Sequence, residues 1–483
     1  MLFNSTEFLF LFLPLSLLLF YGMARWSTQA ALGSLTLASL FFYAWWDWHF
    51  LPVLLVSMVF NFLLGKLLQR EAAYRGYLLA AAVTVNLSAL FLYKYLDFAI
   101  ASLNASLGTS LPTQSLALPL GISFFTFTQL AYLVDVYYRK AKESRVVDYV
   151  LFVTYFPHLI AGPILHHAQM MPQFRSPAIY APRADAIACG LTFLTIGLIK
   201  KVLIADYLAG YATPVFDASS SGASPGFAEA WVGTLAYTLQ LYFDFSGYCD
   251  MAIGISRLFN IDLPLNFASP YKADSISEFW RRWHMTLSQF LRDYLYIPLG
   301  GNRFGRARRY LNLFLTMLLG GLWHGANWTF VIWGALHGAY LIVNHSFTAI
   351  RERLGLPPLP RPLAMGITLI AVVLAWVPFR ADSLATTLNL WQAMLGFYGM
   401  DPTQISDIPV AKATRAIAVG LLIVILAPNS QTLVNGLQTR LRDITATHPA
   451  RAGWALPGLL VGALFSITVM SLGRVSEFLY FQF

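Results

Sequence analysis

Ten long apolar stretches constrain this sequence of 483 residues more than any other feature. A helix needs about 20 predominantly apolar residues to cross a bilayer. The chain is 57% hydrophobic and 11% charged, whereas soluble domains carry about 25% charged residues. Water could not solvate a chain with so much apolar surface, so we predict an all-α, multi-pass membrane protein. The stretches cover residues 7–23, 29–46, 50–65, 77–97, 117–137, 186–207, 227–257, 363–380, 412–428 and 455–473.

Lysine and arginine are concentrated in every second connection between these stretches. They follow the first, third and fifth stretches, whereas the connections around Asp47 and across LNASLGTSLPTQS carry none. Because positive loops stay in the cytoplasm, both the N-terminus and the C-terminal EFLYFQF are predicted to be periplasmic. The net charge of +9 is then a topology signal, and we expect no nucleic-acid partner. The first stretch lacks a basic region and a cleavage site, so it is interpreted as a retained span rather than a signal peptide.

Two further apolar segments cannot cross the membrane completely. The segment YVLFVTYFPHLIAGPIL is interrupted by Pro157, Gly162 and Pro163, which favours a re-entrant or interfacial segment. Residues 311–346 have arginines before and after them, so the chain must enter and return, turning near GGLWHGANW at 320–328. The connection 207–226 has no Lys or Arg and is predicted to be a periplasmic loop.

The resulting prediction is about eleven transmembrane helices together with re-entrant and interfacial helices. They form one domain over 1–483, with N-terminal spans in 1–137, a core with re-entrant segments in 149–346, and C-terminal spans in 363–483. No internal repeat is visible, which weakens the case for a transporter.

His324 lies in the middle of an apolar run, where an ionisable side chain is costly and suggests function. Its neighbours Gly320, Gly321 and Gly325 could serve close helix packing or leave room for a substrate. The alternative for His324 itself is a neutral ring hydrogen-bonded to a backbone carbonyl. His337, thirteen residues later, would lie on the opposite face of a continuous helix, so we expect a supporting or packing role for it.

A second informative block is DSISEFWRRWHMTLSQFLRDYLYIPLGGNR, which contains His284. Ser275 and Glu278 are spaced as a capping box that opens a helix. The tryptophans and arginines that follow are typical of an interfacial helix. Such arginines anchor lipid headgroups, and they could also attract a phosphorylated, anionic cofactor.

Two aspartates, Asp244 and Asp250, interrupt the apolar stretch LQLYFDFSGYCDMAIG. Buried carboxylates need partners, and Arg281 or Arg282 are candidates for this role. The aspartates either line a polar tunnel or lock helices together.

Several other kinds of site are excluded by the pattern. Cys189 and Cys249 lie in apolar stretches without metal-ligand spacing, and His166 with His167 is too isolated to bind a metal. The sequence has no GxxxxGK[ST], no GxGxxG after a strand and no GxSxG. What remains is an imidazole in a membrane cavity, which suits proton abstraction from a hydroxyl during acyl transfer.

The sequence resembles the membrane-bound O-acyltransferase (MBOAT) family. Within this family it resembles the bacterial branch typified by the alginate O-acetylase membrane subunit. The matching stretches include PLGISFFTFTQLAYLVDVYYR, YFPHLIAGPI, the RRWH block, GLWHGANWTFVIWGALHG and WVPFRADSL, in order along the chain. The resemblance implies a ring of helices around a central tunnel. It also implies catalytic roles for His324, in WHG, and His284, in RRWH.

The function implied by the resemblance is transfer of acetyl groups from cytoplasmic acetyl-CoA across the inner membrane. The recipient would be a periplasmic SGNH-type acetyltransferase or a glycan, and His284 would position the thioester or stabilise its oxyanion. Alginate is the first candidate acceptor, and peptidoglycan, cellulose and D-alanylation of teichoic acid are alternatives. A transporter or a structural assembly subunit are the non-enzyme alternatives. We assign acetyl-CoA contacts to Arg281, Arg282, Trp283 and Asn327.

Overall fold

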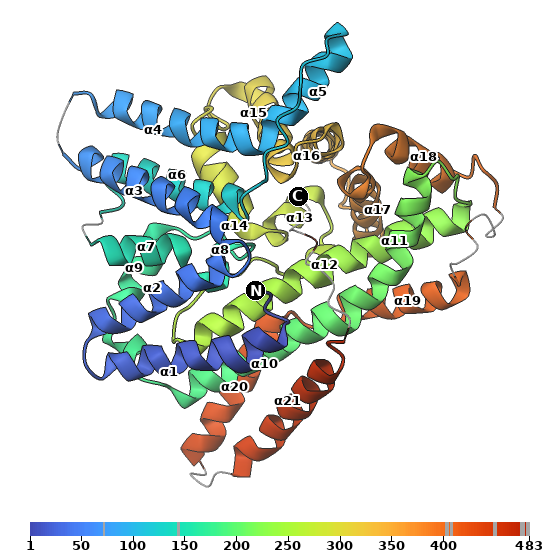
Figure 1. The fold of residues 1–483 in the computed structure, drawn as a ribbon. Helices are drawn as coiled ribbons and strands as arrows, with labels where there is room; N and C mark the ends of the chain where they lie inside the picture. The colour runs from blue at the N-terminus through green and yellow to red at the C-terminus, as the bar shows by residue number, and fades with distance from the viewer. Residues whose placement is uncertain are drawn as a thin grey trace. The chain divides into compact units, whose positions relative to one another are not determined.

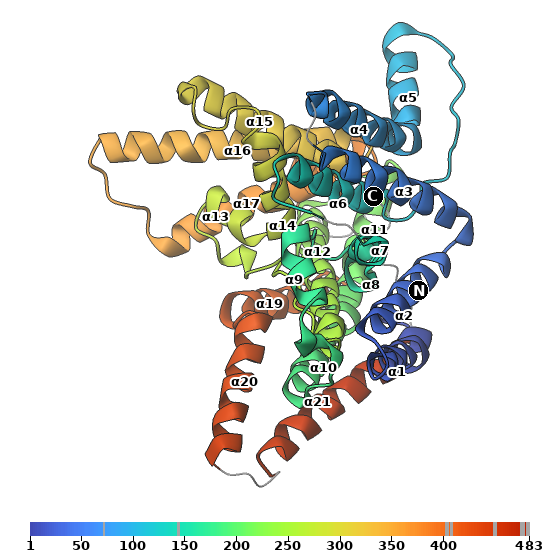
Figure 2. The same ribbon diagram turned by 90° about the vertical axis from the view of Figure 1, so that its left-hand side faces the viewer.

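The fold is known from a computed structural model that describes residues 1–70, 73–142, 145–400, 405, 409–447, 452–473 and 479. Every regular element in these residues is a helix (Figures 1 and 2). This confirms the all-α prediction. The chain divides into two compact units, and the boundary between them passes through one long helix, α12. The assignment of one domain over 1–483 stays a prediction.

The first unit comprises 1–198, 248–264 and 434–475. Within it, α1 and α2 form an antiparallel pair, and α3, α4 and α6 pack against one another (Figure 1). Its helices are α1 (Leu13–Ala24), α2 (Thr28–Ala44), α3 (Leu51–Leu68), α4 (Arg75–Leu90), α5 (Leu96–Leu107), α6 (Ile122–Tyr137), α7 (Val146–Thr154), α8 (Phe156–Leu159), α9 (His167–Phe174), α10 (Ala184–Leu198), α21 (Ala452–Met470) and most of α20 (Ser430–Thr447).

The second unit comprises 199–247, 265–433 and 476–483. Its helices are α11 (Asp206–Ser220), the first part of α12 (Phe227–Leu258), α13 (Ile276–Arg282), α14 (Met285–Leu291), α15 (Gly305–His324), α16 (Trp328–Arg353), α17 (Arg361–Arg380), α18 (Leu384–Met394) and α19 (Val410–Leu426). All residues of the candidate site described below belong to this unit.

Four helical segments in the described residues are long and apolar enough to cross a membrane: Trp48–Leu68, Arg75–Leu107, Ala184–Ser220 and Arg361–Arg380. A bent pair, Val410–Leu426 with Ser430–Thr439, makes five if it counts as one span. The protein is therefore a multi-pass membrane protein, as its composition predicts. All ten predicted apolar stretches contain a helix.

The prediction that residues 207–226 form a loop is wrong. Residues 206–220 form α11, which continues α10 through a π-helical turn at Ile199–Ala205, and only 221–226 connect it to α12. The absence of Lys and Arg places a segment relative to the membrane, but it carries no information on where a helix ends. The helices α5, α18 and α20 were also not predicted. Most of EFLYFQF, and His448, lie outside the described residues.

The predicted break near Pro157 is confirmed. The chain forms α7 and the single turn α8, and then runs without helix from 160 to 166 before α9 begins. His158 lies in α8, and its Nε2 lies 3.0 Å from the carbonyl oxygen of Phe152. Residues 151–165 are all buried, which is the condition for irregular backbone inside a membrane protein.

Candidate functional site

His324 is the last residue of α15, and the chain reverses over Gly325–Asn327 before α16 begins. The two helices form a hairpin that packs along its length (Figure 2). The predicted turn at GGLWHGANW is therefore confirmed. The His324 side chain is only 4% exposed, so the polar ring lies at the inner end of the hairpin.

Gly321 and Gly325 serve close packing within the hairpin, one of the two uses predicted for them. A Cβ on Gly320 would meet only the end of the Leu291 side chain, at 3.1 Å, which leaves both uses open for it. A Cβ on Gly321 would lie 2.3 Å from the Phe330 carbonyl oxygen, and one on Gly325 would lie 2.1 Å from the Phe330 ring. A Cβ on Gly334 would lie 2.5 Å from the carbonyl oxygen of Met317. Only glycine lets the backbones of α15 and α16 approach this closely.

His284 lies at a break that the sequence reading did not predict. The expected single helix after Ser275 ends at Arg282, and α14 begins at Met285. The backbone of His284 has φ 42° and ψ 54°, the left-handed conformation that non-glycine residues seldom adopt. Strained backbone of this kind concentrates at functional sites. One half of the predicted capping box is confirmed, because Ser275 Oγ accepts the Glu278 N–H at 3.2 Å. The Glu278 carboxylate accepts the backbone N–H of Asp274, at 2.9 Å.

Asn266 fixes the orientation and tautomer of His284. Its Oδ1 accepts hydrogen bonds from the backbone N–H of Thr286 at 3.2 Å and from the Thr286 hydroxyl at 3.0 Å. His284 Nδ1 lies 3.1 Å from the same oxygen. Since a backbone N–H can only donate, Oδ1 is an acceptor and Nδ1 must carry the proton. The Nε2 atom of His284 therefore presents a lone pair.

The surroundings of His284 keep it uncharged. The side chain is fully buried, and the Phe245 ring packs edge-to-face against it at 4.8 Å. His284 lies in the connection between two short helices, outside the segments that could cross a membrane. Burial lowers the pKa of His284 well below its usual value, because an apolar environment disfavours the charged ring.

The structure brings His284 and His324 together. Their ring centroids are 6.3 Å apart, although 40 residues separate them in the sequence. Two imidazoles at this separation can both hydrogen-bond to one oxygen atom between them. His324 also contacts the rings of Trp333 and Phe379, at 5.0 and 5.2 Å. The site is thus a histidine pair in an aromatic enclosure, suited to moving a proton from a hydroxyl group.

Three of the other four predicted site residues, Arg282, Trp283 and Asn327, have structural contacts. Arg282 pairs with Glu278, and Arg281 is exposed. Trp283 is buried, with its ring 5.0 Å from that of Trp376. Asn327 caps α16: its Oδ1 accepts the Thr329 N–H at 3.1 Å and its Nδ2 donates to the Asp382 carbonyl at 2.8 Å. Their roles toward acetyl-CoA stay predictions.

Asp244 does not pair with Arg281 or Arg282. Its Oδ1 lies 2.6 Å from Lys201 Nζ, which also lies 2.9 Å from Asp206, and its Oδ2 accepts the backbone N–H of Leu479 at 3.0 Å. The expectation of an arginine partner is wrong because it overlooked Lys201, a lysine within an apolar stretch. This cluster locks helices together, which favours the structural alternative for Asp244.

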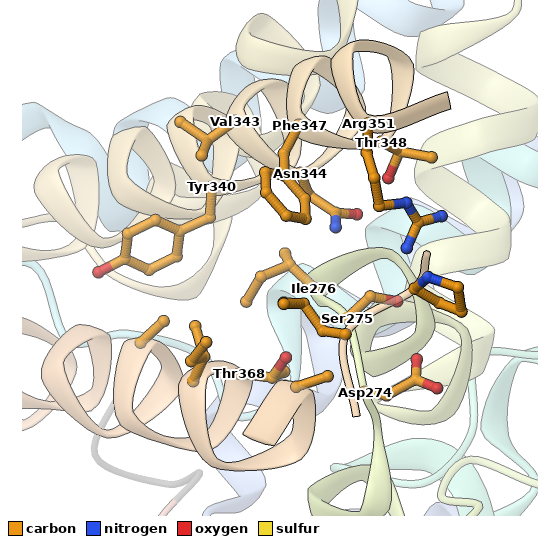
Figure 3. A pocket seen from close by; sticks show the side chains of 15 residues that line it. Asp274, Ser275, Ile276, Tyr340, Val343, Asn344, Phe347, Thr348, Arg351 and Thr368 are labelled. Atoms are coloured by element: carbon orange, nitrogen blue, oxygen red, sulfur yellow. The ribbon is translucent and has the colours of Figure 1, made fainter. Parts of the chain in front are cut away.

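A pocket of about 570 Å³ lies between the start of α13, α16 and α17 (Figure 3). Figure 3 shows Tyr340 at one end of it and Arg351 at the other. The Tyr340 ring lies 5.7 Å from that of His337, which lies 4.9 Å from Trp333, the neighbour of His324. A series of ring contacts thus connects the pocket with the histidine pair.

Comparison with known proteins identifies the family to which this chain is similar. A model of the MBOAT, membrane-bound O-acyltransferase family matches residues 37–376. The chain is 44% identical over 435 residues to the peptidoglycan O-acetyltransferase of Helicobacter pylori, covering 84% of this chain and 82% of that protein.

Two further relatives differ in the acceptor that their names give. A probable alginate O-acetylase AlgI of Azotobacter vinelandii is 39% identical over 518 residues and covers all of both chains. A teichoic acid D-alanyltransferase of Streptococcus thermophilus is 27% identical over 287 residues, covering 55% of this chain and 69% of that protein. All three names describe the transfer of an acyl group.

Proposed function

Because the chain belongs to the membrane-bound O-acyltransferase family, we propose that it passes acetyl groups from cytoplasmic acetyl-CoA across the inner membrane to an exported polysaccharide. Membership confirms the resemblance, and it makes the chain an acyltransferase. The observation that carries the specific proposal is the buried pair His284 and His324, with ring centroids 6.3 Å apart.

His324 is the base in this proposal. It accepts the proton of an acceptor hydroxyl as that oxygen attacks the thioester carbonyl, and it returns the proton to the leaving thiolate. A neutral imidazole in a water-poor site is suited to this task, because it needs no counter-ion before or after the reaction.

His284 positions the base through its Nε2 lone pair, which can accept a hydrogen bond from the second ring nitrogen of His324. The sequence-based alternative, an oxyanion donor, needs a proton on Nε2. With Nδ1 already donating to Asn266, that would require a charged ring, and burial opposes it.

The pocket in Figure 3 supports an acetyl-CoA entrance on the cytoplasmic side. Its volume of about 570 Å³ is within the usual range for small-molecule sites. Arg351 at one end of it suits a phosphate group, while the walls from α16 and α17 are mostly apolar. Arg281 and Arg282 would add positive charge near this entrance, as predicted from the sequence.

The acceptor is a periplasmic SGNH-type acetyltransferase or a glycan hydroxyl, with the termini periplasmic and about eleven spans around a central tunnel. The alternating basic connections support this topology. Alginate is our first choice because the relative from Azotobacter vinelandii aligns over the whole chain. The 44% identity to a peptidoglycan O-acetyltransferase makes peptidoglycan the main alternative.

The test is acetyl transfer by purified protein in lipid nanodiscs, supplied with radiolabelled acetyl-CoA and hydroxyl acceptors. Wild-type protein should release CoA in the presence of an acceptor, and His324→Ala should not. His49→Ala is the matched control, since His49 is an exposed histidine beside Asp47. Full activity in folded His324→Ala would refute the role of His324, and a transporter would release no CoA.

A further inference from the structure

Three polar side chains lie on one face of α16, and the middle one contacts His324. Thr329, Trp333 and His337 follow at intervals of four residues, which places them on the same side of a helix. All three are at most 1% exposed. Their Oγ1, Nε1 and Nε2 atoms have no hydrogen-bond partner among the residues that the structure describes. Buried polar atoms without partners are rare and need an explanation.

The protonation of His337 follows from its other nitrogen. Trp280 Nε1–H donates to His337 Nδ1 at 3.3 Å. An indole N–H can only donate, so Nδ1 is the acceptor and Nε2 carries the proton. His337 and Trp333 therefore each present one buried N–H group. His337 and His284 are held in opposite tautomers, one offering a proton and the other a lone pair.

The location of these two donors suggests what they bind. The Trp333 ring lies 5.0 Å from His324 and 4.9 Å from His337. Their natural ligand is a hydrogen-bond acceptor next to the base, and a thioester presents a carbonyl oxygen there. N–H···π contacts with neighbouring rings are the structural alternative, but such contacts are weak.

We propose that Trp333 Nε1–H and His337 Nε2–H bind the carbonyl oxygen of the acyl thioester and stabilise the oxyanion that forms on it. The inference rests on the acyl transfer proposed above and adds two catalytic residues to it. Donors fixed in place before the reaction, in a site without water, are the most effective form of such stabilisation.

Acyl transfer then proceeds through a tetrahedral intermediate. The acceptor hydroxyl oxygen bonds to the thioester carbon while its proton passes to His324, and the C=O π electrons become a lone pair on the oxygen held by the two N–H groups. The C=O bond re-forms as the C–S bond breaks. The leaving thiolate takes the proton from His324, and an ester and a free thiol result.

Side-chain replacements at both positions test this directly. His337→Leu removes the donor and should lower kcat about 10²- to 10³-fold with a smaller change in KM. His337→Gln keeps an N–H near the position of Nε2 and should recover at least a tenth of the wild-type kcat. Trp333→Phe should also lower kcat, whereas Trp391→Phe, whose indole donates to the Leu374 carbonyl at 3.1 Å, should not.

A second measurement keeps the test informative if a variant is unstable. The infrared carbonyl stretch of bound ¹³C-labelled acetyl-CoA should lie below that of the free thioester in wild type, and should move back in Trp333→Phe. An unchanged kcat in His337→Leu, or the same carbonyl frequency in all proteins, would overturn the inference. Equal loss in His337→Gln and His337→Leu would do so too. Wild-type protein that binds acetyl-CoA yet releases no CoA would instead contradict the proposed function.

Discussion

Two segments of this protein look alike in sequence and differ in what their histidines do. FPHLIAGPILHH in the first unit and GLWHGANW in the second both place histidine among glycine and apolar residues. In the first, His158 contacts the carbonyl oxygen of Phe152 in its own segment. In the second, His324 faces His284, which is held by Asn266 from a separate segment. A buried histidine served by nearby backbone is a structural residue, whereas a pair oriented by a distant side chain is a candidate site.

Removing one histidine from each segment tests this difference most directly. His284→Ala should lower acetyl transfer about 10²- to 10⁴-fold, because the group that aligns the reaction is lost. His158→Ala should keep transfer within about threefold of wild type but lower the melting temperature. CoA release and thermal unfolding of both variants check this. Comparable losses of transfer in both variants would remove the distinction between the two segments.

Replacement of Asn266 tests whether acetyl transfer depends on the orientation of His284 by the Asn266 side chain. Asn266→Ala should lower kcat about 10- to 100-fold, because Nδ1 of His284 loses its acceptor. In Asn266→Asp the acceptor remains, but the carboxylate favours the charged ring and raises the pKa of His284. As the pH is lowered, this variant should therefore lose activity at a higher pH than wild type does. A pH–rate profile measures this shift, and an unmoved acid limb would argue against the contact.

The close spacing of α15 and α16 provides a third test, because His324 lies at the end of this hairpin and the first unit contains no part of the site. Gly321→Ala places a methyl group against the Phe330 carbonyl, so α15 and α16 must separate and His324 must move. We expect about tenfold lower kcat and a loss of about 1–3 kcal/mol of stability. Gly33→Ala in α2 meets no atom within 4 Å and should leave both unchanged. Retained kcat in Gly321→Ala would show that the hairpin tolerates repacking.

The smallest expected effect concerns the approach to the site. Arg351→Ala should raise the KM for acetyl-CoA about three- to tenfold and leave kcat unchanged, because its charge binds donor without touching the reacting atoms. Arg353→Ala, an exposed neighbour, is the control. Steady-state kinetics at varied acetyl-CoA separates the two, and an unchanged KM would exclude the pocket as the entrance.

Much of the helical content was predictable, because transmembrane helices leave a strong apolar signal of about 20 residues. The turn at His324 and the break at Pro157 also followed from local chemistry. Asn266 could not be found this way: it lies in irregular backbone 18 residues from His284, and no local pattern marks a side chain that acts at a distance. Lys201 was detectable, since a lysine inside an apolar stretch requires a partner.

The break at His284 shows a different limit. Residues 275–296 have helical composition, and the capping signal at Ser275 is real. Tertiary contacts nevertheless impose the left-handed conformation, with Asn266 Oδ1 taking the Thr286 N–H that a continuous helix would use otherwise. Helix propensity is a weak preference that such contacts override.

The hydrogen bond from Leu479 to Asp244 has a consequence for how the protein is made. It joins residues 235 positions apart, and Asp244 is the same carboxylate that holds Lys201. A ribosome inserting the chain into the bilayer has produced almost every helix before this amide exists. Asp244 can therefore pair with Lys201 early, but it gains this hydrogen-bond donor only after the next 235 residues have been made.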